Sequence, residues 1–139
     1  MSAGEAFQAG DPLPTVVKEI DQTRIELYAE ASGDFNPIHL DREYAESTEF
    51  GSTIAHGMMV AAVVSEAMAT AFGRLWAEDG RMKLRFRAPV YPGDTVTTFG
   101  EVRRVRDDDG AAEIVCAVGV RRQTGEVAIS GEATVRRAK

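Results

Sequence analysis

The sequence lacks any possibility of an internal disulfide, because Cys116 is the only cysteine among its 139 residues. That cysteine lies in an apolar run, residues 114–118, and is expected to be a small buried residue rather than a nucleophile. A single cysteine agrees with a reducing compartment. The N-terminus also lacks the charged start and apolar run of a secretory signal. We therefore expect a cytoplasmic protein.

Long hydrophobic runs and an excess of positive charge are also missing. Polar side chains interrupt the most apolar stretch, residues 58–76, which predicts a buried helix rather than a membrane span. The formal net charge of −6 argues against nucleic-acid binding, which needs a basic surface. Basic residues still gather at residues 81–87 and 103–106. They form either solvated strand faces or a landing site for a phosphate-bearing carrier.

The composition, with 44% hydrophobic and 27% charged residues, is typical of one globular domain over residues 1–139. Residues 1–14 are expected to be loosely held. The remaining pattern predicts the following elements: strands at 15–20, 82–86, 95–106, 111–121 and 126–136, helices at 22–31, 41–46 and 57–72, and turns at 91–94 and 107–110. Gly73 is expected to loosen or end the longest helix, and the rest of the chain is expected to form strands. The fold class is α+β, with about five mainly antiparallel strands and one long helix across them.

Asp34 and His39 flank a rigid Asn-Pro pair in the first half of the chain. Pro37 lacks an amide hydrogen and pushes Asn36 away from helical geometry, which predicts a stiff non-helical loop over residues 34–39. A histidine and a carboxylate facing one point can share proton transfer. The alternative is a carboxylate at a helix end and a hydrogen-bonded surface histidine.

A second motif, Ala-His-Gly-Met at residues 55–58, begins the longest predicted helix. The first amides of a helix have no internal partners and lie at its positive end. Gly57 would let a ligand approach the backbone closely, an arrangement that suits an oxygen gaining negative charge. The alternative is that Gly57 only relieves crowding where the helix meets the loop.

Three segments together resemble the motifs of MaoC-like dehydratases, most of all those of (R)-specific enoyl-CoA hydratases. They are Tyr-Ala-Glu-Ala-Ser-Gly-Asp-Phe-Asn-Pro-Ile-His at residues 28–39, Ile-Ala-His-Gly-Met at 54–58 and Phe-Arg-Ala-Pro-Val-Tyr-Pro-Gly-Asp at 86–94. The similarity extends roughly over residues 16–135. The resemblance implies a hot-dog fold, in which a curved antiparallel sheet wraps a long helix, and a homodimer with its sites near the subunit interface.

The resemblance also implies roles for individual residues. Asp34 and His39 match the catalytic aspartate and histidine, and Gly57 matches the residue whose amide helps to bind the thioester carbonyl. Ser65 matches a supporting serine. We further expect these neighbours to complete the site or its surroundings: His56 and Met58 as substrate-binding residues, Asn36 as a residue that orients the loop or a water, and Tyr28 in the core.

The implied reaction is the reversible hydration of trans-2-enoyl thioesters of coenzyme A or acyl carrier protein to (R)-3-hydroxyacyl thioesters, without metal or organic cofactor. Which of Asp34 and His39 takes the first proton stays open, as does the acyl length. One alternative is a thioesterase on the same fold, and another is a subunit of a heterodimeric dehydratase. A third is a metal site from Asp34, His39 and His56, although their spacing fits no helical metal motif.

Overall fold

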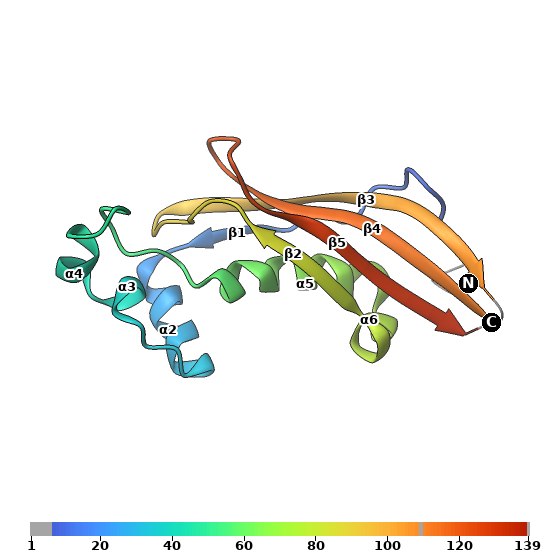
Figure 1. Ribbon diagram of the computed structural model, residues 1–139, viewed down its shortest axis with the longest axis horizontal. Helices are drawn as coiled ribbons and strands as arrows, with labels where there is room; N and C mark the ends of the chain where they lie inside the picture. The colour runs from blue at the N-terminus through green and yellow to red at the C-terminus, as the bar shows by residue number, and fades with distance from the viewer. Residues whose placement is uncertain (1–6, 109, 139) are drawn as a thin grey trace.

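One antiparallel sheet crossed by one long helix makes up the computed structural model, which describes residues 7–108 and 110–138 (Figure 1). The strands lie in the order β1-β3-β4-β5-β2 and all pairs are antiparallel. Their bounds are Val17–Ile20 for β1, Arg81–Phe86 for β2, Asp94–Asp108 for β3, Ala111–Arg122 for β4 and Val127–Ala138 for β5. The helices are α2 (Gln22–Ser32), α3 (Pro37–Leu40), α4 (Arg42–Glu46), α5 (Gly57–Phe72) and α6 (Arg74–Asp79). This architecture confirms the predicted hot-dog fold.

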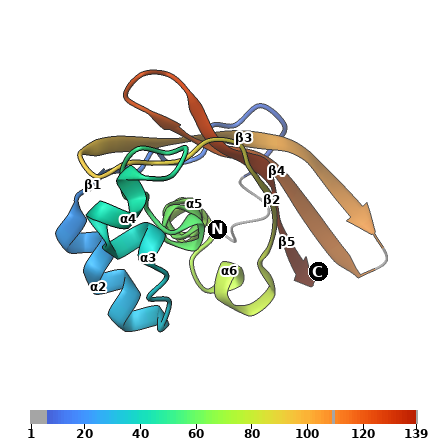
Figure 2. The same cartoon turned by 60° about the vertical axis from the view of Figure 1, so that its left-hand side comes forward.

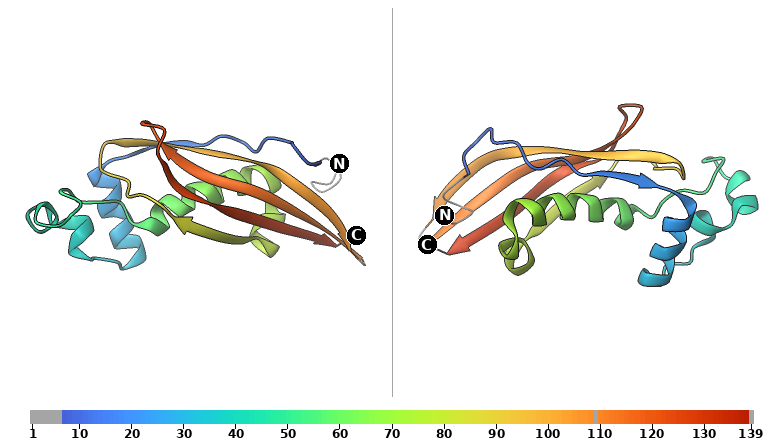
Figure 3. Two further views of the ribbon diagram at one scale, coloured as in Figure 1. Left: turned by 45° about the horizontal axis from the view of Figure 1, so that its top comes forward. Right: turned by 180° about the vertical axis from the view of Figure 1, so that it is seen from behind.

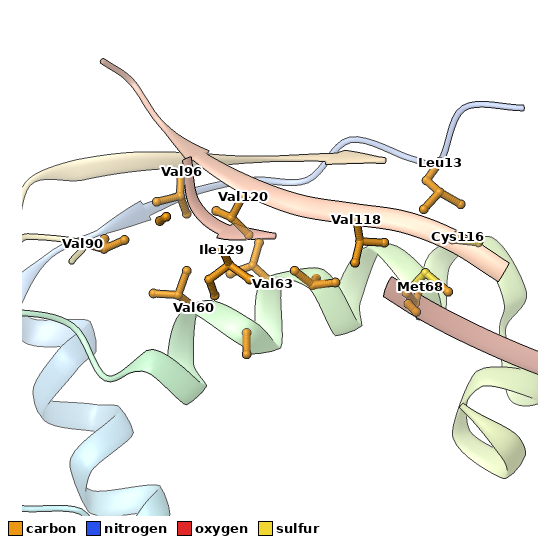
Figure 4. Packing of buried hydrophobic residues seen from close by; sticks show 14 of the residues in the cluster. Leu13, Val60, Val63, Met68, Val90, Val96, Cys116, Val118, Val120 and Ile129 are labelled. Atoms are coloured by element: carbon orange, nitrogen blue, oxygen red, sulfur yellow. The ribbon is translucent and has the colours of Figure 1, made fainter. Parts of the chain in front are cut away.

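The core lies between α5 and the face of the sheet that curves over it (Figure 2). Val60, Val63 and Met68 recur at helical spacing and point toward Val118 and other strand residues (Figure 4). Burying one such side chain stabilises the fold by about 2 kcal/mol. Cys116 is confirmed as a core residue, and burial raises the pKa of its thiol to about 11. The packing of this core fixes the position of the start of α5 relative to the sheet.

The short helices α2, α3 and α4 gather at the end of the molecule where α5 begins, whereas α6 lies at the far end (Figures 1 and 3). Asp34, His39 and His56 belong to the segments that meet at this first end. Within the part of the chain that the structure describes, no helix has the length and apolarity that a membrane crossing requires.

The non-helical loop predicted for residues 34–39 is wrong in its second half, where α3 forms. Asn36 is extended (φ −55°, ψ 130°), as its place before a proline requires, and its side-chain oxygen accepts a hydrogen bond from the Ile38 amide at 3.1 Å. Pro37 then occupies the first helical position, where its missing amide hydrogen costs nothing. Proline therefore begins the turn that carries His39 rather than keeping the chain extended.

The expectation that only strands follow Gly73 is also wrong, because α6 follows it. Gly73 ends α5 with φ 56° and ψ −131°, a conformation that favours glycine and redirects the chain. The indole Nε1 of Trp76 then donates to the Ser65 hydroxyl at 2.9 Å and ties α6 back to α5. The sequence pattern of residues 74–79 did not predict this helix, because a helix of less than two turns is too short to show a clear hydrophobic period.

Residues 7–14 are not loosely held as predicted, since they pack along β3. The Gly10 amide donates to the Val102 carbonyl at 2.8 Å, and the Leu13 amide donates to the Gly100 carbonyl at 3.0 Å. Leu13 is buried in the core. Residues 1–6, and Asp109 of the predicted turn at 107–110, lie outside the described residues.

A buried ion pair joins the start of β3 to the end of β4. The Arg122 Nε lies 2.7 Å from Asp94 Oδ2, and the Gln123 side chain and the Tyr91 amide also donate to this carboxylate, each at 2.8 Å. Burial alone would raise the pKa of Asp94, but these hydrogen bonds outweigh it and hold the pKa below its ordinary value of 3.8. The pair thereby anchors the turn that follows Val90.

We expect Arg122→Met to lower the free energy of unfolding by about 3 kcal/mol, because the Asp94 carboxylate would stay buried without its cation. Urea denaturation at neutral pH measures this loss. Because the pKa of Asp94 is lower in the folded than in the unfolded chain, the stabilisation is present above pH 3.8 and is lost as the pH falls below it. The exposed pair of Arg74 and Glu78 supplies a control, since Arg74→Met should cost less than about 0.5 kcal/mol. Equal losses in the two variants would contradict the prediction.

Candidate active site

His39 is buried at the third position of the one-turn helix α3 and has a defined tautomer. Its Nδ1 lies 2.8 Å from the Ile54 carbonyl oxygen. Because a carbonyl oxygen only accepts hydrogen bonds, Nδ1 must be the donor, and in the neutral ring Nε2 carries the lone pair. His39 therefore holds one nitrogen against the loop before α5 and has the other available as a base.

His56 is fixed in the same way and supports both members of the predicted pair. Its Nε2 donates to the backbone carbonyl of Asp34 at 2.9 Å, and its ring stacks on that of His39 with centroids 3.8 Å apart. The side chain is only 2% exposed, and among the described residues its Nδ1 has no hydrogen-bond partner. Tyr28, expected in the core, is half-buried with its ring 4.8 Å from that of His56. Through the contacts of His56, the Asp34 backbone and the His39 ring are held in place.

Asp34 follows directly on the end of α2. Gly33 ends that helix with φ 79°, a left-handed conformation that favours glycine, and this turns the chain toward α3. The backbone amide of Asn36 donates to Asp34 Oδ1 at 3.2 Å, and the orienting role expected for Asn36 stays a prediction. A carboxylate oxygen of Asp34 and a ring nitrogen from each of His39 and His56 lie within 4.8 Å of one another. The structure thus brings the predicted acid–base pair together, with Asp34 exposed and His39 buried.

The start of α5 presents two free backbone donors beside this pair. The amides of Met59 and Val60 donate to the His56 carbonyl, whereas those of Gly57 and Met58 have no acceptor among the described residues. A Cβ added to Gly57 would lie 2.9 Å from the Phe86 ring, which would have to shift to admit it. The crowding that the sequence allowed as an alternative is therefore real, and the two amides can still donate to a ligand.

Two hollows meet at Gly57 and Phe86. One, of about 320 Å³, is lined by His39 together with mainly apolar side chains, which include Phe50, Ile54 and Ile129. The other, of about 330 Å³, is lined by Asp34, His56 and Met58, with Tyr28 and Ser32. A ligand whose carbonyl oxygen lies at the Gly57 amide can therefore have His39 on one side and Asp34 on the other.

Ser65 is not brought to this site within one chain. It lies a little over two turns past Gly57 in α5, about 12 Å along the helix axis. Its hydroxyl accepts the hydrogen bond from Trp76 instead of contacting Asp34 or His39. The supporting role implied by the resemblance stays a prediction.

Asp34, His39 and His56, the alternative metal site considered from the sequence, lie close enough together to supply ligands to one ion. The two histidine rings, however, are stacked with only 23° between their planes. Ring lone pairs lie in the ring planes, and zinc needs its ligands to converge at about 2 Å in a tetrahedral arrangement. Two stacked imidazoles do not aim at one point, so the geometry favours an acid–base site over a zinc site.

Comparisons with known proteins identify relatives of this chain. The family model of the MaoC-like domain matches residues 3–125. A 3-hydroxybutyryl-CoA dehydratase of Methylorubrum extorquens is 37% identical over 86% of this chain and 74% of its own length. An (R)-specific enoyl-CoA hydratase of Rhodospirillum rubrum is 36% identical over 87% of this chain and 82% of its own. The solved (R)-hydratase of A. caviae superposes with a TM-score of 0.80 at 29% identity, covering 97% of this chain and 99% of that one.

Proposed function

The chain belongs to the MaoC-like dehydratase family, and on that basis we propose that Asp34 and His39 are its catalytic residues. Its relatives are named as hydratases and dehydratases of acyl thioesters, so the chain is a hydro-lyase of the same kind. The reaction is the reversible addition of water to a trans-2-enoyl thioester, giving an (R)-3-hydroxyacyl thioester. One observation supports the residue assignment. The Asp34 carboxylate, the Nε2 of His39 and the first amides of α5 lie around two adjoining hollows.

The proposed mechanism uses one water held between the pair. The water donates one hydrogen to the Asp34 carboxylate and the other to Nε2 of His39. The thioester oxygen accepts hydrogen bonds from the amides of Gly57 and Met58, which draws electrons from the double bond and makes the β carbon electrophilic. As the water oxygen bonds to the β carbon, the pair takes its proton and returns it to the α carbon. All atoms of the water end in the product, so no cofactor is required.

A second copy of the chain is proposed to cover the exposed side of the site. Phe35, Met58 and Phe86 are 59%, 63% and 55% exposed, and all three lie in segments that form or adjoin the site. β2 is also an edge strand, and along its outer side no strand of the described residues pairs with its backbone groups. Exposed apolar groups of this kind mark interaction surfaces. A homodimer in the cytoplasm would bury them and exclude bulk solvent from the site, leaving only the reacting water at Asp34. Light scattering should then give the mass of two chains.

The decisive experiment is a hydration assay with the purified chain alone. Crotonyl-CoA should lose its enoyl absorbance, and chiral analysis should identify (R)-3-hydroxybutyryl-CoA. A thiol reagent should detect no free coenzyme A, and a chelator should leave the rate unchanged. Thiol release without loss of the double bond would indicate a thioesterase. Activity only after addition of a second protein would indicate a heterodimeric dehydratase.

A further inference from the structure

A hollow of about 320 Å³ on the sheet is bordered by basic side chains that the proposed mechanism does not use. Lys83 and Arg85 come from the edge strand β2, and Arg87 follows directly after it. Ser130 and Glu132 of β5 line the opposite side, paired in register with Arg85 and Lys83 respectively. Alternate residues of a strand project from the same face, so Lys83 and Arg85 lie side by side.

Lys83 and Arg85 have no ion-pair partner among the described residues. In the part of the chain that the structure describes, no carboxylate lies within ion-pair distance of Lys83 or Arg85, although Lys18, Arg74 and Arg122 each have one. Both side chains are exposed. The hollow therefore presents three cations against the single carboxylate of Glu132, in a protein whose net charge is −6. A positively charged hollow on a protein of negative net charge attracts an anionic ligand.

The hollow adjoins the cavity that holds His39. Arg87 lines both, and its Nη1 donates to the Ser130 hydroxyl at 3.0 Å. Ala128 and Ile129 line the cavity, and the next residues of β5 line the hollow. A thioester with its carbonyl oxygen at the Gly57 amide can therefore extend its carrier arm past Arg87 into the hollow.

We propose that Lys83 and Arg85 bind the phosphate groups of coenzyme A. This inference rests on the proposed function, because it concerns the carrier of the same thioester substrate. Coenzyme A carries a pyrophosphate and a 3′-phosphate at the end remote from its sulfur, and its pantetheine arm is uncharged. Lysine and arginine form charge-assisted hydrogen bonds with phosphate oxygens, whereas the apolar cavity beside His39 suits the acyl group.

The test compares two thioesters in a charge-removing double variant. Crotonyl-N-acetylcysteamine retains the reacting atoms and the first part of the arm but has no phosphate. In Lys83→Gln/Arg85→Gln, we expect kcat/KM for crotonyl-CoA to fall about tenfold through a higher KM, since exposed ion pairs are individually weak. The ratio of kcat/KM between crotonyl-CoA and crotonyl-N-acetylcysteamine should fall by the same factor. Arg103→Gln/Arg106→Gln removes equal charge from the other basic cluster and should leave the ratio unchanged.

Binding of free coenzyme A and of dephospho-coenzyme A provides a second readout. Calorimetry should show tighter binding of coenzyme A by the unaltered protein and nearly equal binding of the two by the Lys83/Arg85 variant. A ratio of kcat/KM values that changes less than twofold would overturn the proposal, as would equal loss with both thioesters. Selective loss of turnover of an acyl carrier protein thioester would overturn it in favour of an acidic protein carrier. If the unaltered protein hydrates neither thioester, the proposed function fails instead, and calorimetry still decides whether the hollow binds phosphate.

Discussion

Replacing His39 by glutamine is expected to lower kcat for hydration of crotonyl-CoA by about 10³-fold while the protein stays folded. The Nδ1 of His39 donates to the Ile54 carbonyl, so its Nε2 is the nitrogen available to the water. Glutamine fills a similar volume, and its terminal amide takes the place of Nε2, so the bond from Nδ1 to Ile54 is given up. It has no nitrogen that can accept a proton, so the loss reports proton transfer rather than packing.

The measurement is the steady-state rate of loss of the enoyl absorbance, with urea denaturation of the same preparation as the test of folding. Ser65→Ala serves as the comparison, since Ser65 bonds to Trp76 and does not reach the pair within one chain. It should reduce kcat by less than either catalytic substitution. Turnover near that of the unaltered protein in His39→Gln would remove His39 from the mechanism.

The sequence was sufficient to predict the elements whose pattern is regular and local. The apolar run at residues 57–72 predicted α5 with its observed bounds, and alternation at residues 82–86 predicted most of β2. Asp34 and His39 could be paired because a short segment with one proline limits how far they can separate. Regular periodicity and short chain distance are properties of the sequence itself, so these predictions needed no tertiary information.

The contacts between separate segments could not be predicted in this way. His56 stacks on His39 and holds the Asp34 carbonyl only because α5 begins beside α3, and nothing in the spacing of these residues encodes that. Tyr28 was assigned to the core because helical spacing shows which residues share a face but not what that face meets. α3 was missed for a different reason, because the same proline is compatible with a stiff loop and with the first position of a helix.

Replacing Asp34 by asparagine is expected to lower kcat by a similar factor, about 10³-fold, with little change in the loop. Asparagine keeps an oxygen that can accept the hydrogen bond from the Asn36 amide, and His56 holds the backbone carbonyl at position 34 whatever the side chain is. The substitution removes the negative charge and turns one oxygen into an amide group that donates to the water. The proton can then no longer be shared, although the water can still be held.

The double variant Asp34→Asn/His39→Gln tests whether the two residues act on one water. If they do, removal of either already disables the proton transfer, so the combined loss of kcat should stay within about tenfold of the larger single loss. Independent roles would instead multiply the two effects to about 10⁶-fold, a result that would contradict a shared water. The comparison is valid only at equal folding, which urea denaturation of all three variants checks. Non-additive losses would agree with the observed geometry, because a carboxylate oxygen of Asp34 lies within 4.8 Å of a ring nitrogen of His39, and one water can bridge two atoms at that distance.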